Sequence, residues 1–143
     1  MQLRVVADSN VLISALHSGG GPPGVVVDHA RRGDFTLYLS AFILEEVARI
    51  LIDKLHWTPQ RVFSALVGLR NAGTVVDPGP PRLHILPDET DNQIIECALA
   101  ARARYLVTGD RALLALGTHG RVRIVSPRVF LDAEPWVIRQ RLS

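Results

Sequence analysis

The stretch LRVVADSNVL, residues 3–12, decides the fold. Its first five residues are apolar apart from Arg4, too few for a stable helix, and the run stops at Asp8-Ser9-Asn10. A short apolar run that ends at polar residues is typical of a strand buried in a parallel sheet. We therefore expect a strand over residues 3–7, with Asp8 at its carboxyl end.

Beyond this stretch, strand patterns alternate with helical patterns. Short apolar runs predict strands at residues 35–39, 74–76, 105–108 and 122–125. Periodicity and start or stop residues predict helices at 11–16, 25–32, 40–55, 58–73, 90–103 and 110–116, with a break in the Gly- and Pro-rich residues 18–24. The alternation indicates an α/β fold with a parallel sheet. Its third and fourth helices form a helical hairpin, a candidate arm or dimer surface.

The composition is that of one globular domain over residues 1–143. Hydrophobic residues make up 48% of the chain and charged residues 21%, which is not the composition of a disordered protein. The N-terminus lacks the apolar core of a signal peptide and no apolar run is long enough to span a bilayer, so we expect a soluble protein with no membrane partner. The single cysteine, Cys97, fits a reducing cytoplasm and a small buried side chain.

Basic charge is concentrated in the last third of the chain. Residues 1–100 carry 8 basic and 11 acidic side chains, a net −3, whereas residues 101–143 carry 8 basic and 3 acidic, a net +5. The candidates to line an RNA path are therefore Arg102, Arg104, Arg111, Arg121 and Arg123. Scattered, solvated arginines explain the same pattern, and the placement of these side chains decides between the two interpretations.

Two acidic residues, Asp8 and Asp110, directly follow predicted strands. In open parallel sheets the functional crevice lies beyond the carboxyl ends of the strands, so both side chains are placed to share it. On the helix over 40–55, Glu45 and Glu46 compete for a place in the same crevice. Glu45 has a surface explanation as the i,i+4 partner of Arg49, whereas Glu46 has apolar helical neighbours, which favours Glu46.

Asp91 is the last candidate acid, in the first turn of the helix that capping-box spacing predicts to begin at Thr90. Helical spacing puts Asp91 on the same side as Ile95, on the face predicted to be buried. A purely structural role, satisfying backbone donors at the helix start, is the alternative to metal binding. The assignment within residues 88–92 stays open, with Asp91 favoured over Asp88, Glu89 and Asn92.

A cluster of four carboxylates implies a metal ion. Carboxylates in one crevice repel one another unless a hard cation such as Mg²⁺ or Mn²⁺ neutralises them through oxygen ligands. Such an ion lowers the pKa of bound water and stabilises charge on the attacking and leaving oxygens of a phosphodiester. The predicted chemistry is therefore hydrolytic cleavage of phosphodiester bonds.

The order and spacing of these pieces resemble the PIN domain family. The matching pieces span nearly the whole chain: residues 5–12, 40–47, 91–98 and 106–110. The resemblance implies a three-layer α/β/α sandwich around a parallel sheet of about five strands. It matches the acidic quartet of the family to Asp8, Glu46, Asp91 and Asp110, and it gives supporting roles around the carboxylates to Asn10, Thr108 and Asn92.

The resemblance also implies an activity and partners. It predicts a ribonuclease that acts on single-stranded or structured RNA with Mg²⁺ or Mn²⁺. Members of the family are frequently VapC-like toxins of toxin–antitoxin pairs and usually homodimers. An antitoxin protein and a second copy of the chain are therefore expected partners alongside RNA.

Other residues carry weaker signals. The five histidines show no HxH or HExxH spacing for a zinc site. Residues 19–21 lack the Lys-Ser/Thr ending of a phosphate-binding loop and predict a mobile loop beside the site. Trp57 and Trp136 occupy ordinary packing positions rather than base-stacking ones.

Two functions from other classes compete with the ribonuclease. One is phosphoryl transfer with Asp8 as the nucleophile, although the residue two positions on, where that chemistry expects a second acid, is Asn10. The other is a non-catalytic PIN-like module that binds RNA or protein through the crevice and the helical hairpin. The acidic quartet disfavours this module, because a pure RNA binder gains nothing from clustered negative charge.

Overall fold

The computed structural model of the protein describes residues 2–134. Its strands are β1 (Arg4–Ala7), β2 (Thr36–Leu39), β3 (Gly73–Val75), β4 (Tyr105–Val107), β5 (Thr118–His119) and β6 (Val122–Val125). Its helices are α1 (Ser9–Ser18), α2 (Gly21–Arg31), α3 (Ala41–Asp53), α4 (Pro59–Ala72), α5 (Glu89–Ala100), α6 (Arg111–Leu116) and α7 (Pro127–Ala133). None of these helices is long and apolar enough to cross a membrane.

The sheet has the strand order β3-β2-β1-β4-β6-β5. Five of its strands run parallel, as the alternating pattern predicts, and β5 is an antiparallel edge on β6. The short strand β5 was not predicted, because it has only two residues and no apolar run. Val5, Val6 and Ala7 of β1 are completely buried in the middle of the sheet, which explains why this strand is apolar on both faces.

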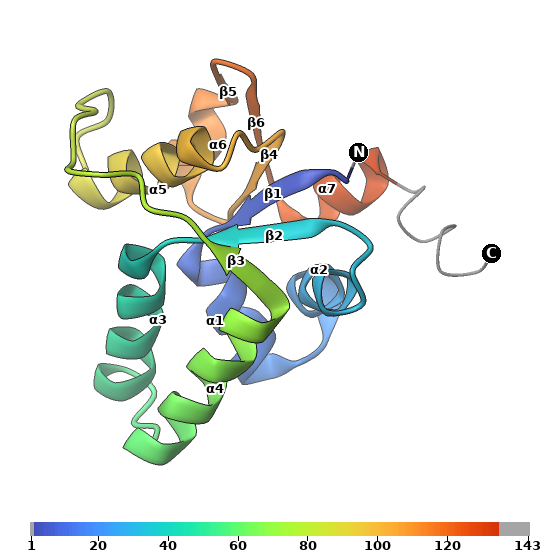
Figure 1. Ribbon diagram of the computed structural model, residues 1–143, viewed down its shortest axis with the longest axis vertical. Helices are drawn as coiled ribbons and strands as arrows, with labels where there is room; N and C mark the ends of the chain where they lie inside the picture. Colours follow the sequence, from blue (N-terminus) through green and yellow to red (C-terminus); the bar gives the residue numbers. More distant parts are fainter. Residues whose placement is uncertain (1, 135–143) are drawn as a thin grey trace.

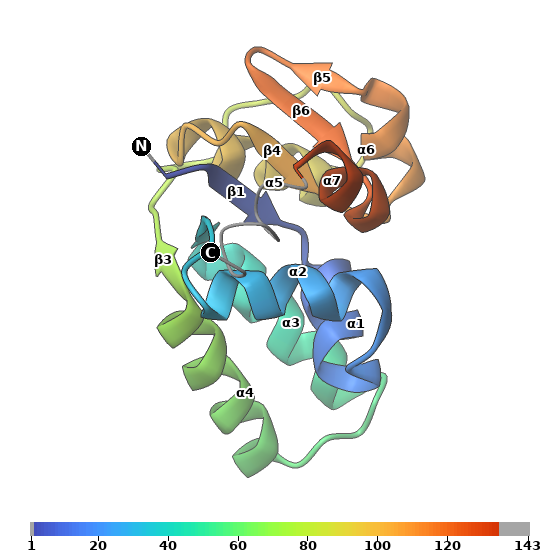
Figure 2. The ribbon, with the colours of Figure 1, turned by 90° about the vertical axis from the view of Figure 1, so that its right-hand side faces the viewer.

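Helices cover both faces of the sheet, so the predicted three-layer α/β/α sandwich is confirmed (Figures 1 and 2). From β1 the chain moves outward to β2 and β3, and the connecting helices α1 to α4 lie on one face. It then returns through α5 to β4, on the other side of β1, and continues through α6 to β6. Because such crossovers are right-handed, reversing the direction puts α5 and α6 on the opposite face. The reversal makes the gap between β1 and β4 the switch point of the sheet, where α/β folds bind ligands.

The predicted helical hairpin is present as α3 packed against α4 (Figure 1). Ser40 caps α3 as expected, since its hydroxyl accepts a hydrogen bond from the Ile43 amide at 3.2 Å. Trp57, in the turn of the hairpin, packs against the core, and the Arg61 guanidinium lies 3.8 Å from the centre of its ring. The other tryptophan, Trp136, lies outside the described residues.

Three predicted helix starts are wrong: α1 begins at Ser9 rather than at residue 11, and the other two belong to α2 and α5. The break expected over residues 18–24 is shorter, because α2 already begins at Gly21 with prolines at its first positions, where a missing amide hydrogen costs nothing. Glycine is required at position 24, where α2 packs closely against the end of α1, since a Cβ there would lie 2.6 Å from the Gly19 carbonyl oxygen. The helix expected to begin at Thr90 begins at Glu89, because the Asp88 carboxylate caps it by accepting from the Thr90 amide at 2.8 Å. It also ends at Ala100 rather than near residue 103.

The last helix, α7, was not predicted either. Phe130 of this helix is completely buried, with its ring edge-on to Phe35 at 5.4 Å and to Tyr105 at 5.2 Å. These contacts close the core beneath β4. Cys97 is completely buried in the same core, in agreement with its expected role as a small apolar residue.

Candidate functional site

A hollow of about 550 Å³ opens at the carboxyl ends of β1 and β4. All four predicted acids line it: Asp8 follows β1, Glu46 lies on α3, Asp91 on the first turn of α5, and Asp110 follows β4. The strand order explains the meeting of Asp8 and Asp110, since β1 and β4 are neighbours with the register Ala7 to Val107. The hollow lies at the switch point of the sheet, where the fold leaves room for a ligand.

Asp8 is the most firmly held of the four acids. Its Oδ2 accepts hydrogen bonds from the Thr108 hydroxyl at 2.8 Å and from the Asn10 amide at 3.2 Å, and its Oδ1 accepts from the Ser9 backbone at 2.7 Å. Burial raises the pKa of Asp8, and these hydrogen bonds from Thr108 and Ser9 offset part of that rise. The surroundings therefore fix the direction of this carboxylate while keeping it close to the surface of the hollow.

Ser9 links two of the acids, a role that the sequence analysis missed. Its hydroxyl lies 3.3 Å from Asp8 Oδ1 and also donates to Glu46 Oε1. The other oxygen of Glu46 lies 3.9 Å from the Arg49 guanidinium, one turn along α3. Glu45 is exposed, and the i,i+4 pair expected between Glu45 and Arg49 is replaced by this i,i+3 pair with Glu46.

Asp91 shows most clearly that the acids share one electrostatic environment. It is 6% exposed, and its pKa is raised from 3.8 to about 6, first by burial and then by the charges of Asp110, Asp88, Asp8 and Glu46. The negative charges of the neighbouring carboxylates therefore make Asp91 harder to ionise. A cation in the hollow would relieve this repulsion and lower the pKa again.

Asp110 and its neighbours form a rigid rim. The Asp110 carboxylate caps α6 by accepting from the Leu113 amide at 3.1 Å, and the Asp110 amide donates to the Thr108 hydroxyl at 3.0 Å. Asn10 reaches across from α1 and accepts from the Gly109 amide at 3.0 Å. Thr108 and Asn10 thus tie the turn after β4 to the turn after β1.

Asn92 does not line the hollow. Its side chain is completely buried, and its carbonyl oxygen accepts from the Leu86 amide at 2.9 Å and from the Ile85 amide at 3.2 Å. Its amide group donates back to the Leu86 carbonyl at 2.9 Å. Asn92 therefore shapes the loop before α5, and any support that it gives to Asp91 is indirect.

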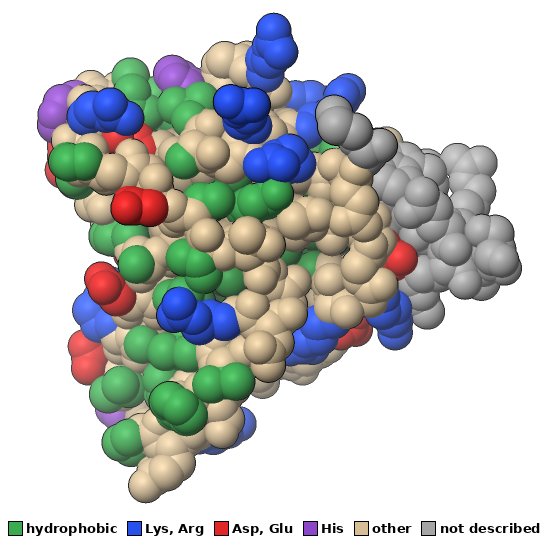
Figure 3. Space-filling view, viewed as in Figure 1, with side chains coloured by type: hydrophobic (Ala, Val, Ile, Leu, Met, Phe, Trp, Pro, Cys, Tyr) green, Lys and Arg blue, Asp and Glu red, His purple; other side chains and the backbone are tan. Residues whose placement is uncertain are grey.

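The predicted RNA-contacting arginines are not gathered at the hollow. Arg102 lines a separate depression with Arg4, and the Arg104 amide donates to the Arg4 carbonyl, so both lie at the amino ends of β1 and β4, across the sheet from Asp8. Figure 3 shows basic side chains over this part of the molecule, where Figure 1 places β6 and the start of β1. Arg111 follows Asp110 directly and is exposed.

The basic residues that do line the hollow are Arg49 and Lys54, on and just after α3. Neither was predicted to contact RNA, because their charges are balanced by nearby acids along the chain. Only the packing of α3 against α1 brings them to the acidic hollow.

Two further expectations concern the surroundings of the hollow. Residues 19–21 are not among its lining and lie at the opposite end of α1 from Asp8, about 15 Å away for ten helical residues, so the expected glycine loop beside the site is wrong. Two of the histidines pair with acids elsewhere, His29 with Asp34 at 2.7 Å and His84 with Glu89 at 3.2 Å. No histidine lines the hollow in the described part of the chain.

The donor chemistry of the hollow suits a hard divalent cation, because all four acids offer carboxylate oxygens. Within residues 2–134, however, no three His, Cys, Asp or Glu side chains are grouped closely enough to hold an ion as they stand. Mg²⁺ does not need such a group, since it usually keeps several waters and binds through one or two carboxylates. The carboxylates are therefore of the right chemical type for a divalent ion, although they do not form a complete set of ligands by themselves.

Comparison with known proteins agrees with the geometry. The family model described as PIN domain matches residues 4–112, which include all four acids of the hollow. The chain is also similar to the uncharacterized protein MJ1680 of Methanocaldococcus jannaschii, with 26% identity over 144 residues that cover 92% of each chain. The matched residues make up more than half of the chain, and they run from β1 into α6, with the switch point between them. The protein therefore belongs to the PIN domain family, whose fold is of the nuclease type.

Proposed function

We propose that this protein is a ribonuclease that hydrolyses single-stranded RNA with Mg²⁺ or Mn²⁺. The observation that carries the proposal is the meeting of Asp8, Glu46, Asp91 and Asp110 in one hollow at the switch point of a PIN fold. A non-catalytic RNA binder has no use for such a cluster, because four negative charges repel a phosphate backbone.

The side chains have separate tasks in this proposal. Asp8, fixed by Thr108 and Ser9, presents an oriented carboxylate oxygen to the hollow. Asp91, with its pKa raised by its neighbours, is the acid whose charge depends most on a cation being bound. A bound divalent ion supplies an activated water and stabilises the charge that develops on the phosphate oxygens. The chain contributes the positions and charges of these side chains around a hollow that is open to solvent.

Contacts to the RNA backbone come from Arg49 and Lys54 in this proposal. Both line the hollow, and the Arg49 side chain is 57% exposed, so its guanidinium can turn from Glu46 towards a phosphate. Together they draw the backbone to the edge of an otherwise negative hollow.

We also propose that the protein binds a second copy of this chain through α4 of the helical hairpin. Phe63 and Val67 lie four residues apart on α4 and therefore share a face, and they are 70% and 40% exposed. Contiguous exposed apolar surface marks protein-binding sites, and these two side chains would form the centre of such a surface in the dimer. An antitoxin that masks the hollow is the other partner that the family resemblance suggests.

A matched pair of variants on one helix tests the activity. Purified wild type, Glu46→Gln and Glu45→Gln are incubated with Mn²⁺ and with single-stranded RNA and DNA of one sequence. We expect Glu46→Gln to slow RNA cleavage by more than about 100-fold, the upper end for residues that only support a metal ligand, and Glu45→Gln to cut at the wild-type rate. Asp8→Asn should behave like Glu46→Gln, because Asn keeps the helix cap and loses the charge.

Three outcomes contradict the proposal. Equal activity in Glu45→Gln and Glu46→Gln would remove Glu46 from the site. Cleavage of DNA without cleavage of RNA would correct the substrate. A folded wild type that binds RNA equally well in Mn²⁺ and in chelator, and never cuts it, would establish the binding module instead.

A further inference from the structure

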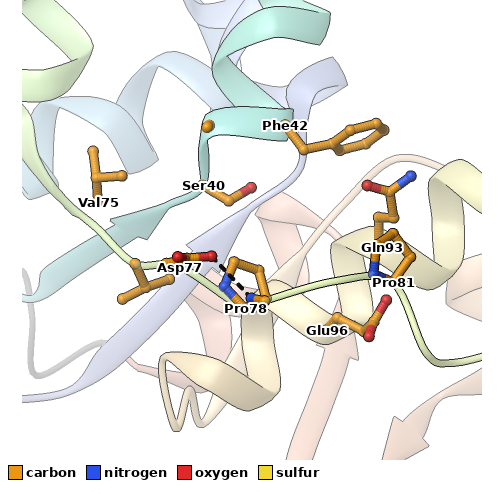
Figure 4. Close-up of a pocket in the computed structure, with 11 residues that line it drawn as sticks. Ser40, Phe42, Val75, Asp77, Pro78, Pro81, Gln93 and Glu96 are labelled. Carbon is orange, nitrogen blue, oxygen red and sulfur yellow. Dashed lines mark hydrogen bonds between the residues drawn. The ribbon is translucent and has the colours of Figure 1, made fainter.

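A second cavity, of about 420 Å³, opens at the carboxyl ends of β2 and β3. Its walls come from the start of α3, from the extended residues 75–81 and from α5. Figure 4 shows Phe42 of α3 on one side of this cavity, and Gln93 and Glu96 of α5, with Pro81 beside them, on the other. None of the four acids of the hollow lines it.

The cavity and the acidic hollow are neighbours along the same two helices. Phe42 and Glu46 are four residues apart on α3, so they share a face with about 5–6 Å between their Cβ atoms. On α5, Asp91 lines the hollow and Gln93 lines the cavity. Both spaces therefore open between α3 and α5, at the same edge of the sheet.

The lining of the cavity suits an uncharged, planar ligand. Phe42 and the two prolines Pro78 and Pro81 offer flat apolar surfaces, and Gln93 offers one donor and one acceptor group. None of the described lining residues is Lys or Arg, while Asp77 and Glu96 are acids, so a phosphate group is disfavoured. The volume is within the range of small-molecule sites, about 300–1,000 Å³.

We propose that this cavity is a base-binding subsite, which takes one unstacked nucleobase of an RNA strand whose backbone lies in the acidic hollow. The inference rests on the proposed function, and it adds a determinant of substrate choice. Proteins recognise single-stranded RNA by stacking splayed bases on aromatic side chains and by hydrogen bonding to their edges. Phe42 provides the stacking surface and Gln93 the edge contact.

Glu96 gives the subsite a preference among bases. It is 8% exposed, and its Oε1 accepts from the Arg82 amide at 2.9 Å, which fixes the carboxylate at the cavity wall. A carboxylate only accepts hydrogen bonds, so it favours a base with an exocyclic amino group. Adenine, cytosine and guanine carry such a group, whereas uracil offers a carboxylate only its ring N3–H donor. We therefore expect adenosine and cytidine to bind more tightly than uridine.

The test uses nucleosides, which have no phosphate and need no metal. Adenosine, cytidine and uridine are titrated into ¹⁵N-labelled full-length protein in chelator, and backbone and Gln side-chain amide shifts are followed by NMR. We expect shifts of the backbone amides of Phe42, Val75, Val76, Asp77 and Gly79, and of the Gln93 side chain. Phe42→Ala should weaken adenosine binding by about fivefold or more, since loss of a stacked ring costs about 1–3 kcal/mol.

Two controls keep the result interpretable. Val129→Ala removes an exposed apolar side chain from α7, which does not line the cavity, and should leave nucleoside binding unchanged. Gln93→Ala changes a half-buried side chain and tests the subsite even if Phe42→Ala does not fold. Nucleosides that shift no resonance of the cavity, or that bind equally to wild type, Phe42→Ala and Gln93→Ala, would overturn the inference.

The outcome also separates this inference from the proposed activity. Nucleoside binding in the cavity without RNA cleavage would leave the subsite in place and remove the ribonuclease. RNA cleavage with no nucleoside shifts in the cavity would keep the ribonuclease and remove the subsite.

Discussion

The Thr108 hydroxyl donates a 2.8 Å hydrogen bond to the Asp8 carboxylate, and the two residues follow neighbouring strands, β4 and β1. The same hydroxyl oxygen accepts from the Asp110 amide at 3.0 Å. Thr108 is completely buried. Its hydroxyl therefore orients the turn that carries Asp110 and stabilises the charged form of Asp8. In the proposed ribonuclease, Thr108 is a positioning residue for both acids.

Replacing Thr108 by valine should shift the pH dependence of cleavage. The hydrogen bond from Thr108 lowers the pKa of Asp8 against the effect of burial, so Thr108→Val raises that pKa further. The acid limb of the pH–rate profile should then move to higher pH, with lower kcat at neutral pH. The measurement is the initial rate of RNA cleavage between pH 5 and 9, in buffers of constant Mn²⁺ concentration.

Thr108→Ser is the matched variant, because serine keeps the hydroxyl and should restore the acid limb. Thr118→Val, an exposed threonine on β5, controls for the substitution itself. An acid limb that stays in place in Thr108→Val would show that the hydrogen bond does not set the charge of Asp8.

Neutralising Asp91 should stabilise the metal-free protein at neutral pH. In the folded state the Asp91 pKa is raised from 3.8 to about 6, so ionising this acid costs folding free energy. The cost is absent below about pH 4, grows as the pH rises through 6, and is then constant. At about 1.4 kcal/mol per pKa unit, Asp91→Asn should gain on the order of 1–3 kcal/mol in the free energy of unfolding at pH 7.5 and little at pH 4.

Urea unfolding in chelator at the two pH values measures this difference. Asp53→Asn, an exposed acid at the end of α3, is the control and should change little. In saturating Mn²⁺ the order should reverse, because wild type gains stability from a bound ion and the variant loses a ligand. A variant that is less stable than wild type in chelator at pH 7.5 would show that Asp91 is not repelled by its neighbours.

The fold was largely predictable because its signals are local. Short apolar runs mark the parallel strands, and the polar residue after each run marks its carboxyl end, so the approach of Asp8 and Asp110 follows from the topology of a parallel sheet. The elements that were missed have no such signal: β5 is two polar residues, and α7 owes its place to Phe130 packing between two distant rings.

The candidate site was predictable only in part. The structure brings the four predicted acids into one hollow, but the hydrogen bonds of Ser9 depend on how α3 packs against α1. Asn92 sits beside Asp91 in the sequence, yet its amide turns to the loop before α5, since adjacent helical residues point about 100° apart. A residue that is adjacent in the chain to one of the four acids therefore need not line the hollow.

Arg49→Gln and Lys54→Gln should each weaken RNA binding and reduce its salt dependence. For single-stranded nucleic acid, each lost phosphate contact lowers the slope of log K against log salt by about 0.7. The measurement is fluorescence anisotropy of a labelled single-stranded RNA between about 50 and 200 mM salt. It is made in an Asp8→Asn background so that the RNA stays intact.

Arg104→Gln is the control, because the structure places Arg104 across the sheet from the hollow. If Arg104→Gln reduces the slope while Arg49→Gln and Lys54→Gln do not, the RNA binds at the amino ends of the strands. In that case the charge distribution along the sequence would have located the RNA surface correctly. The RNA contacts proposed for Arg49 and Lys54 would then have to be abandoned, because both line the hollow at the other end of the strands.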